Sequence, residues 1–288
     1  AENCTQCMEC IAACPDTAMP NTSQDVGTVL RSAVQHYVTD EGARHKLMDA
    51  LPEVEKRVRE AMKAAVKSKE VRPFKDLVRA EVCELSEVSA DAKEELFAIV
   101  DILPLAYSKS HAIFSSIEKK NCGEGGLFAI FVSDLCKGCA ECVTECGSHE
   151  ALKMTHDSEE LNTRYASATA FFDLLPDTDQ KYLGLYDDDK PQDSKAAALR
   201  NHLMVRRNYE ALVSGDGACA GCGEKSILRA IASVTEAYMR PLYHAKAERL
   251  RAKADGLEKD GAAMLASLLQ RAPEQHATFT RTVGHAVM

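Results

Sequence analysis

The stretch "CTQCMECIAACP" at residues 4–15 places four cysteines at spacings of two, two and three residues and ends in a proline. A second stretch, "CKGCAECVTECG" at 136–147, repeats this spacing, with each cysteine 132 residues after its counterpart. The positions between the cysteines agree as well, since Glu9 matches Glu141 and Ile11 matches Val143. The chain is therefore organised around an internal repeat whose two copies lie far apart in the sequence.

Composition narrows the class of protein. The 288 residues are 45% hydrophobic, which is enough for a sizeable core, and the net charge of -9 argues against nucleic acid as a partner. No apolar run approaches the roughly 20 residues that a bilayer requires, and the N-terminal "AENCTQC" is unlike a signal peptide. We therefore expect a cytoplasmic chain that binds no membrane. Because the cytosol keeps thiols reduced, the 12 cysteines indicate metal or redox centres.

The cysteine spacing suits a cubane iron-sulfur cluster. C-x2-C-x2-C lets a loop of backbone supply three thiolates, and the fourth cysteine, one helical turn further on, points away from that loop. "LFAIFV" at 127–132 predicts a strand before the second motif, and "ALKMT" at 151–155 predicts one after it. With these features the chain resembles two-cluster ferredoxin domains over about residues 1–20 and 125–156.

In two-cluster ferredoxins the fourth cysteine of each motif ligates the cluster of the other motif, so the resemblance implies two [4Fe-4S] clusters with crossed ligands. The first set is Cys4, Cys7, Cys10 and Cys146, and the second set is Cys136, Cys139, Cys142 and Cys14. Gly147 stands where that pattern has a second proline, a departure that affects a turn and removes no ligand. The alternative is zinc, which usually takes four cysteines as two separated pairs.

A third cysteine group lies in "SGDGACAGCGEKS" at 214–226. This string resembles the opening of the thiamine-diphosphate domain in pyruvate:ferredoxin (flavodoxin) oxidoreductases. The resemblance implies that Cys219 and Cys222 are ligands of a third [4Fe-4S] cluster and that Glu224 contacts thiamine diphosphate. Asp216 receives no magnesium role, because the metal motif needs a later asparagine and none follows Asn208. No cysteine follows Cys222, so we expect this third site to be partial and the chain to be a piece of a longer polypeptide.

Between and after the cysteine motifs, apolar residues recur at helical spacing. Three predicted core-facing stripes are Val26, Val29, Leu30, Ala33, Val34 and Tyr37, then Val54, Val58, Met62 and Val66, then Leu96, Ile99, Val100 and Leu103. The stretch after Pro241, rich in Ala, Leu, Lys and Glu, predicts a helical hairpin with a break at Gly256 to Gly261. Cys83 and Cys122 lie outside the motifs and receive no role, since a lone cysteine is usually a buried small hydrophobe.

The sequence therefore predicts an α+β fold in three parts. Residues 1–156 form a two-cluster ferredoxin-like domain with a helical insertion at about 22–120. Residues 157–213 form a polar linker with one or two short helices, such as 195–212. Residues 214–288 form the N-terminal part of a thiamine-diphosphate domain, truncated within its helical hairpin.

The resemblance implies the electron-transfer portion of a thiamine-diphosphate-dependent 2-oxoacid oxidoreductase, with pyruvate the favoured substrate. Such enzymes oxidatively decarboxylate the oxoacid to an acyl-CoA and pass electrons through iron-sulfur clusters to ferredoxin or flavodoxin. The full-length enzyme would use thiamine diphosphate, magnesium and coenzyme A and would form a homo-oligomer, and the isolated chain would not turn over substrate. Two alternatives remain open at this point: a ferredoxin-like electron carrier subunit of another redox complex, and a structural zinc protein.

Overall fold

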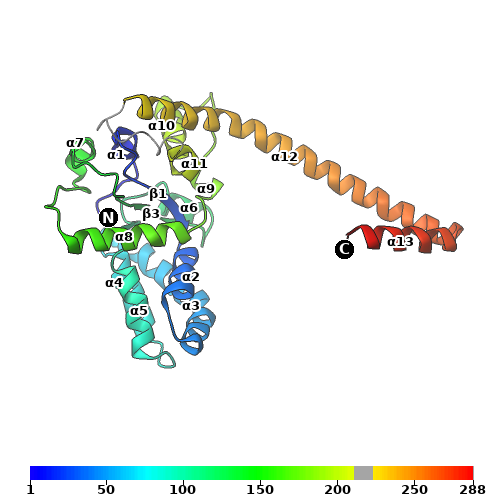
Figure 1. Ribbon diagram of the computed structural model, residues 1–288, viewed down its shortest axis with the longest axis horizontal. Coiled ribbons are helices and arrows are strands. Elements are labelled where there is room, and N and C mark those ends of the chain that lie inside the picture. Colours follow the sequence, from blue (N-terminus) through cyan, green and yellow to red (C-terminus); the bar gives the residue numbers. More distant parts are fainter. Residues whose placement is uncertain (211–222, 288) are drawn as a thin grey trace. The chain divides into compact units, whose positions relative to one another are not determined.

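The computed structural model describes residues 1–210 and 223–287 (Figure 1). Over these residues the chain is mostly helical, with a three-stranded antiparallel sheet, which confirms the α+β class in its broad form. By its internal contacts the chain separates into one compact unit from Ala1 to Tyr238 and another from Met239 onward. All ten cysteines whose positions are described belong to the first unit.

The sheet pairs the segment after the first cysteine motif with the segment before the second. Strand β3 (Gly126–Ile130) lies between β1 (Asn21–Asp25) and β2 (Leu105–Ala106), and both neighbours are antiparallel to it. Asn21 pairs with Ile130, so the two ends that adjoin the cysteine motifs lie side by side. The sheet register therefore brings the two copies of the repeat together.

The two predicted strands have different outcomes. The strand predicted at 127–132 is confirmed as β3. The strand predicted at 151–155 is wrong, because these residues form no strand. The backbone amide of Ala151 donates to Cys146 Sγ at 3.3 Å. This amide is therefore bonded to a cysteine sulfur and not to the backbone of a neighbouring strand.

The insertion is helical as predicted. It contains α2 (Val26–Tyr37), α3 (Glu41–Ser68), α4 (Phe74–Cys83), α5 (Ala90–Val100) and α6 (Ser115–Lys120). Asp40 caps α3 by accepting from the Ala43 amide at 2.6 Å, and Ser89 caps α5. The three apolar stripes are confirmed: their members are buried in one core except for Tyr37 and Val66, which pack against it partly exposed. Figure 1 shows α2–α5 grouped on the side of the sheet away from α1 and α7.

Residues 157–210, expected to be a linker, pack onto the rest of the first unit. They form α8 (Glu159–Leu174), α9 (Gln180–Leu183), α10 (Gln192–Asn201), a short 3-10 turn (His202–Met204) and α11 (Arg206–Tyr209). Phe171 and Phe172 of α8 join the core of the insertion. Tyr182, Met204 and Tyr209 instead pack with the first cysteine motif. This segment therefore contributes to both hydrophobic cores.

Helix α12 (Gly223–Arg271) begins in the first unit and continues into the second, where α13 (Pro273–Val287) follows. The predicted break at Gly256 to Gly261 is wrong, because α12 is continuous there. An interior glycine costs only about 1 kcal/mol relative to alanine, which the surrounding strong helix formers offset. Proline is favoured at the first position of a helix, and the break between helices falls instead just before Pro273, where α13 begins. No helix in the described part of the chain is long and apolar enough to cross a bilayer.

Gly126, the first residue of β3, provides a test of packing at the sheet. A methyl group on its Cα would collide with the hydroxyl and ring of Tyr182, whose hydroxyl lies 2.8 Å from the Asp25 carboxylate. We expect Gly126→Ala to lower the free energy of unfolding by about 1–3 kcal/mol, measured by urea denaturation. Gly42→Ala is the matched control, since a methyl group there would meet only Asp40 Oδ1 at 3.4 Å. Equal losses in both variants would contradict this account.

Candidate metal centre

The two cysteine motifs adopt the same local backbone. Each loops into a short helix, α1 (Glu9–Ala13) or α7 (Glu141–Cys146), and these two helices pack against each other. Gln6 and Met8 have left-handed φ angles of 61° and 67°, and Gly138 and Ala140, 132 residues later, have 69° and 66°. The sequence repeat is therefore also a conformational repeat.

Left-handed backbone is costly for residues other than glycine, by about 1–3 kcal/mol, and persists only where the surroundings enforce it. Burial enforces it in the first motif. The side chain of Met8 is buried, and the Gln6 amide donates to Asn201 Oδ1 at 2.8 Å. The loop that presents Cys4, Cys7 and Cys10 is therefore fixed by contacts with α10 as well as by its own sequence.

The first set of cysteines surrounds a common cavity. Cys4, Cys7, Cys10 and Cys146 all line it. Apolar side chains complete the wall, among them Met8, Phe128, Ile130 and Leu152. The fourth cysteine of the second motif thus faces the three thiols of the first motif.

The electrostatics of the thiols reflect the same grouping. Burial raises the pKa of the Cys4 thiol, and the nearby Cys7 and Cys146 raise it further. The pKa of Cys10 is raised strongly, by burial first and then by its cysteine neighbours, including Cys146. These thiols lie close enough that their thiolate forms would repel one another. Such repulsion is relieved when a cationic centre binds between thiolates.

The second set is grouped around Cys142. Burial raises the pKa of Cys142, and the next contribution comes from Cys14 of the first motif, ahead of Cys136 and Cys139. Cys14 is buried, whereas Cys136 and Cys139 are exposed. Cys14 thus lies close enough to the second motif to affect Cys142, and two cysteines of the second set are exposed, whereas none of the first set is.

Backbone amides point at the sulfur of the fourth cysteine in each motif. Ala18 donates its amide to Cys14 Sγ, and Ala151 donates its amide to Cys146 Sγ, both at 3.3 Å. Hydrogen bonds to cluster sulfurs are one of the means by which proteins set reduction potentials. The loop after each motif thus fixes the sulfur that reaches across to the other motif.

The cysteine donors and the amide donors fit a [4Fe-4S] cluster in each set, and in the first set the apolar wall adds to this fit. Within residues 1–210 and 223–287, no three His, Cys, Asp or Glu side chains come close enough together to hold a single ion. Thiolates around a cubane are spread over four irons, so they stand further apart than the ligands of one ion. All ten described cysteines are free thiols. The assignment of each cysteine to a cluster stays a prediction.

The remaining predicted residues are spread over other parts of the chain. Cys219, Cys222 and Asp216 lie outside the described residues. Glu224 lies exposed in the first turn of α12. Cys83 is exposed, so the expectation that it is buried is wrong. Cys122 is also exposed, and its sulfur accepts a hydrogen bond from Lys63 Nζ at 3.4 Å.

Sequence reasoning missed one residue of this region, Arg229 on α12. Its side chain is 1% exposed and donates to the carbonyl oxygens of Ala12 and Cys14. Its partners precede it by more than 200 residues, and a single arginine in "SILRAIASV" carries no local pattern that marks it. Only the folded arrangement identifies Arg229 as part of the site.

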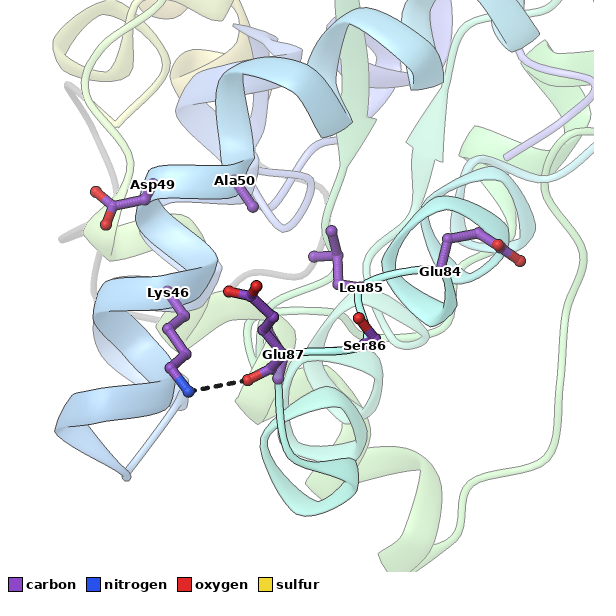
Figure 2. A pocket seen from close by; sticks show the side chains of 8 residues that line it. Lys46, Asp49, Ala50, Glu84, Leu85, Ser86 and Glu87 are labelled. Carbon is purple, nitrogen blue, oxygen red and sulfur yellow. Dashed lines mark hydrogen bonds between the residues drawn. The ribbon is translucent and has the colours of Figure 1, made fainter.

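A separate groove lies within the helical insertion (Figure 2). It has a volume of about 430 Å³ and lies between α3 and the connection from α4 to α5. Lys46 Nζ spans it by donating to the Glu87 carbonyl at 3.1 Å. None of the residues that line this groove is a predicted site residue, so it receives no functional role.

Comparisons of this chain with protein-family models, with curated proteins and with solved structures gave no match.

Proposed function

We propose that this chain binds two [4Fe-4S] clusters in a two-cluster ferredoxin-like domain and is the electron-transfer portion of a thiamine-diphosphate-dependent 2-oxoacid oxidoreductase. Pyruvate is the favoured oxoacid. The observation that carries the proposal is the position of Cys146, which lines one cavity together with Cys4, Cys7 and Cys10 although the two motifs are far apart in sequence. Such crossing is the property that separates a two-cluster ferredoxin arrangement from two independent four-cysteine sites.

The redox part of the proposal rests on the chemistry of the two sets. A bound [4Fe-4S] cluster would supply one-electron acceptor and donor chemistry. The chain contributes thiolate ligands, amide donors to Cys14 and Cys146, and the apolar side chains of Phe128 and Leu152, which line the cavity of the first set. Restricted water access and amide donors are the protein's means of setting the potential.

The oxoacid part of the proposal rests on the string "GACAGCGE" at 217–224. By resemblance, Cys219 and Cys222 would belong to a third cluster and Glu224 would contact thiamine diphosphate. Oxidation of a 2-oxoacid releases two electrons, whereas ferredoxin and flavodoxin accept them singly, so cluster relays are needed between the two. Arg229 supports the link, because the helix that begins at Gly223, within this string, contacts the loop of Cys14 directly.

Metal and sulfide analysis tests the proposal. Chain prepared anaerobically should hold about eight irons and about eight acid-labile sulfides, and after reduction it should give the electron paramagnetic resonance spectrum of two interacting [4Fe-4S] centres. Cys83→Ser should leave both values unchanged, because Cys83 is exposed at the end of α4 and outside both sets. Zinc without labile sulfide would refute the redox function. Two clusters combined with no response of the full-length protein to thiamine diphosphate would favour the electron-carrier alternative.

A further inference from the structure

The guanidinium of Arg229 lies against the loop that carries Cys14. Nη2 donates to the Cys14 carbonyl at 2.8 Å and to the Ala12 carbonyl at 2.9 Å, and Nη1 donates to Thr17 Oγ1 at 3.1 Å. The same guanidinium lies 5.2 Å from the ring centroid of Tyr209, within the range of a cation–π contact. A side chain from α12 thus reaches the end of α1 through three hydrogen bonds and one aromatic contact.

These contacts restrain a strained segment. Thr17 has a φ of 57°, which is unfavourable for a β-branched residue and persists only where the surroundings enforce it. Ala12 and Cys14 lie at the end of α1, where helix carbonyls lack partners within the helix. Arg229 satisfies two of these carbonyls and holds Thr17, while the Ala18 amide donates to Cys14 Sγ. Arg229 therefore restrains the loop that carries the Cys14 sulfur.

Arg229 also brings a buried positive charge next to Cys14. Among the described residues its hydrogen-bond partners are two carbonyls and a hydroxyl, none of which carries a charge. Arg200, the other arginine that reaches this motif, forms an ion pair with Glu9 at 3.0 Å. No carboxylate among the described residues pairs with Arg229, and a buried cation of this kind favours the addition of negative charge nearby. Electron uptake by a cluster is such an addition.

We propose that Arg229 is a positioning residue for the cluster of the second set, and that it raises the reduction potential of this cluster relative to that of the first set. The inference rests on the proposed function, since it requires both clusters. The inference also gives α12 a structural role. This helix begins directly after Cys222, and Arg229 binds it to the loop that carries Cys14.

The test is an anaerobic redox titration of the cluster-loaded chain, followed by electron paramagnetic resonance. We expect Arg229→Gln to reduce the equilibrium constant for reduction of the second-set cluster at least about tenfold, which is 59 mV for one electron, and to change the first-set cluster less. Arg229→Lys keeps the charge but cannot reproduce the three-acceptor contact. In Arg229→Lys, the reduction potential of the second-set cluster should therefore stay close to the wild-type value. That cluster should lose iron to a chelator faster than in the wild type. The signals absent from a Cys14→Ala chain identify the second-set cluster.

Arg206→Gln is the matched control. Arg206 also donates to a carbonyl, that of Phe172 at 2.8 Å, and lies 4.2 Å from the ring centroid of Phe172. It pairs with Asp173 at 3.5 Å, and none of these partners belongs to a cysteine motif. It should therefore leave both potentials unchanged. Arg229→Met, which keeps the apolar stem, replaces the glutamine variant if that variant does not retain the cluster. A second possible result also supports the proposal. Arg229→Gln and Arg229→Met would both lose the second-set cluster alone, while Arg229→Lys would retain it.

Three results would overturn the inference: an unchanged potential in Arg229→Gln, an equal shift in both clusters, or a shift of the same size in Arg206→Gln. Loss of both clusters in both neutral variants would overturn it too, because it would indicate a general structural role. A wild-type chain without iron and sulfide would instead refute the proposed function. The two failures are therefore distinguishable in the same experiment.

Discussion

A Cys14→Ala chain should lose about half of its iron, and the lost half should be the cluster of the second motif. Cys14 belongs to the first motif in sequence, but after burial its thiol makes the next contribution to the raised pKa of Cys142. The three other thiols of its own motif face Cys146 across a shared cavity. Removal of the Cys14 sulfur therefore takes a ligand from the second set and leaves the first set complete.

Iron and sulfide content measure the loss, and electron paramagnetic resonance identifies the cluster that remains. Two interacting centres should give way to one centre without magnetic coupling. Cys146→Ala is the mirror-image variant and should remove the first-set cluster instead. Equal damage to both clusters in Cys14→Ala, or selective damage to the cluster of Cys4, Cys7 and Cys10, would refute the crossed assignment.

Arg59→Met should destabilise the first unit by about 3–5 kcal/mol, the range found when one partner of a buried ion pair is removed. The Arg59 side chain is buried in the middle of α3 and is bound to three carboxylates, those of Glu55 at 2.9 Å, Glu118 at 3.5 Å and Asp25 at 3.9 Å. It also donates to the Gly125 carbonyl immediately before β3. Arg59 thus joins the helical insertion to the sheet.

Glu118 carries most of the expected cost. Burial raises the pKa of its carboxyl group, but the amides of Gly123 and Gly125, together with Lys63 and Arg59, outweigh this and hold the pKa below its usual value. The lowered pKa contributes stability that is fully present above the unfolded-chain pKa and is lost as pH falls through the folded-state value. The difference in the free energy of unfolding between wild type and Arg59→Met should therefore be smaller at acidic pH than at neutral pH.

Urea denaturation at neutral and acidic pH measures both effects. Arg57→Met is the control from the same helix, since Arg57 is exposed and pairs only at the surface with Glu53, at 3.2 Å, an interaction worth less than about 1 kcal/mol. Addition of Glu118→Gln to Arg59→Met should recover part of the loss, because it removes a buried carboxylate that has lost Arg59 and keeps only part of its compensation, from Lys63 and two backbone amides. Equal destabilisation by Arg57→Met and Arg59→Met would contradict the role given to the buried network.

The features predicted from sequence are those that depend on local spacing. The cysteine repeat specifies loop and helix in both motifs, and the apolar stripes specify the buried faces of α2, α3 and α5. Strand β3 was predicted because it is apolar. Its neighbour β1 was not, because its sequence is "NTSQD" and yet Asn21 to Gln24 are buried. A strand made of buried polar residues lacks the alternation of apolar and polar residues by which strands are predicted from sequence.

Partners of β1 come from distant sequence, which is why they could not be predicted. Thr178 Oγ1 lies 3.1 Å from Thr22 Oγ1 and accepts from the Ser23 amide at 3.2 Å, and Gln24 donates to the Pro176 carbonyl at 2.6 Å. The segment that looked like a polar linker therefore supplies hydrogen bonds to the sheet. Polar composition indicates exposure only when no other polar segment folds against it.

The distance between the two motifs also determines when a cluster site can first exist during synthesis. Cys146 is translated 132 residues after Cys14, so the cavity of the first set lacks its last wall while the whole helical insertion is being made. At ordinary rates of translation this interval is about 7–26 s. For that time Cys4, Cys7 and Cys10 are open thiols on a nascent chain. Under the proposed function, delivery of the first-set cluster must wait until Cys146 has been made, or a carrier must protect these thiols until then.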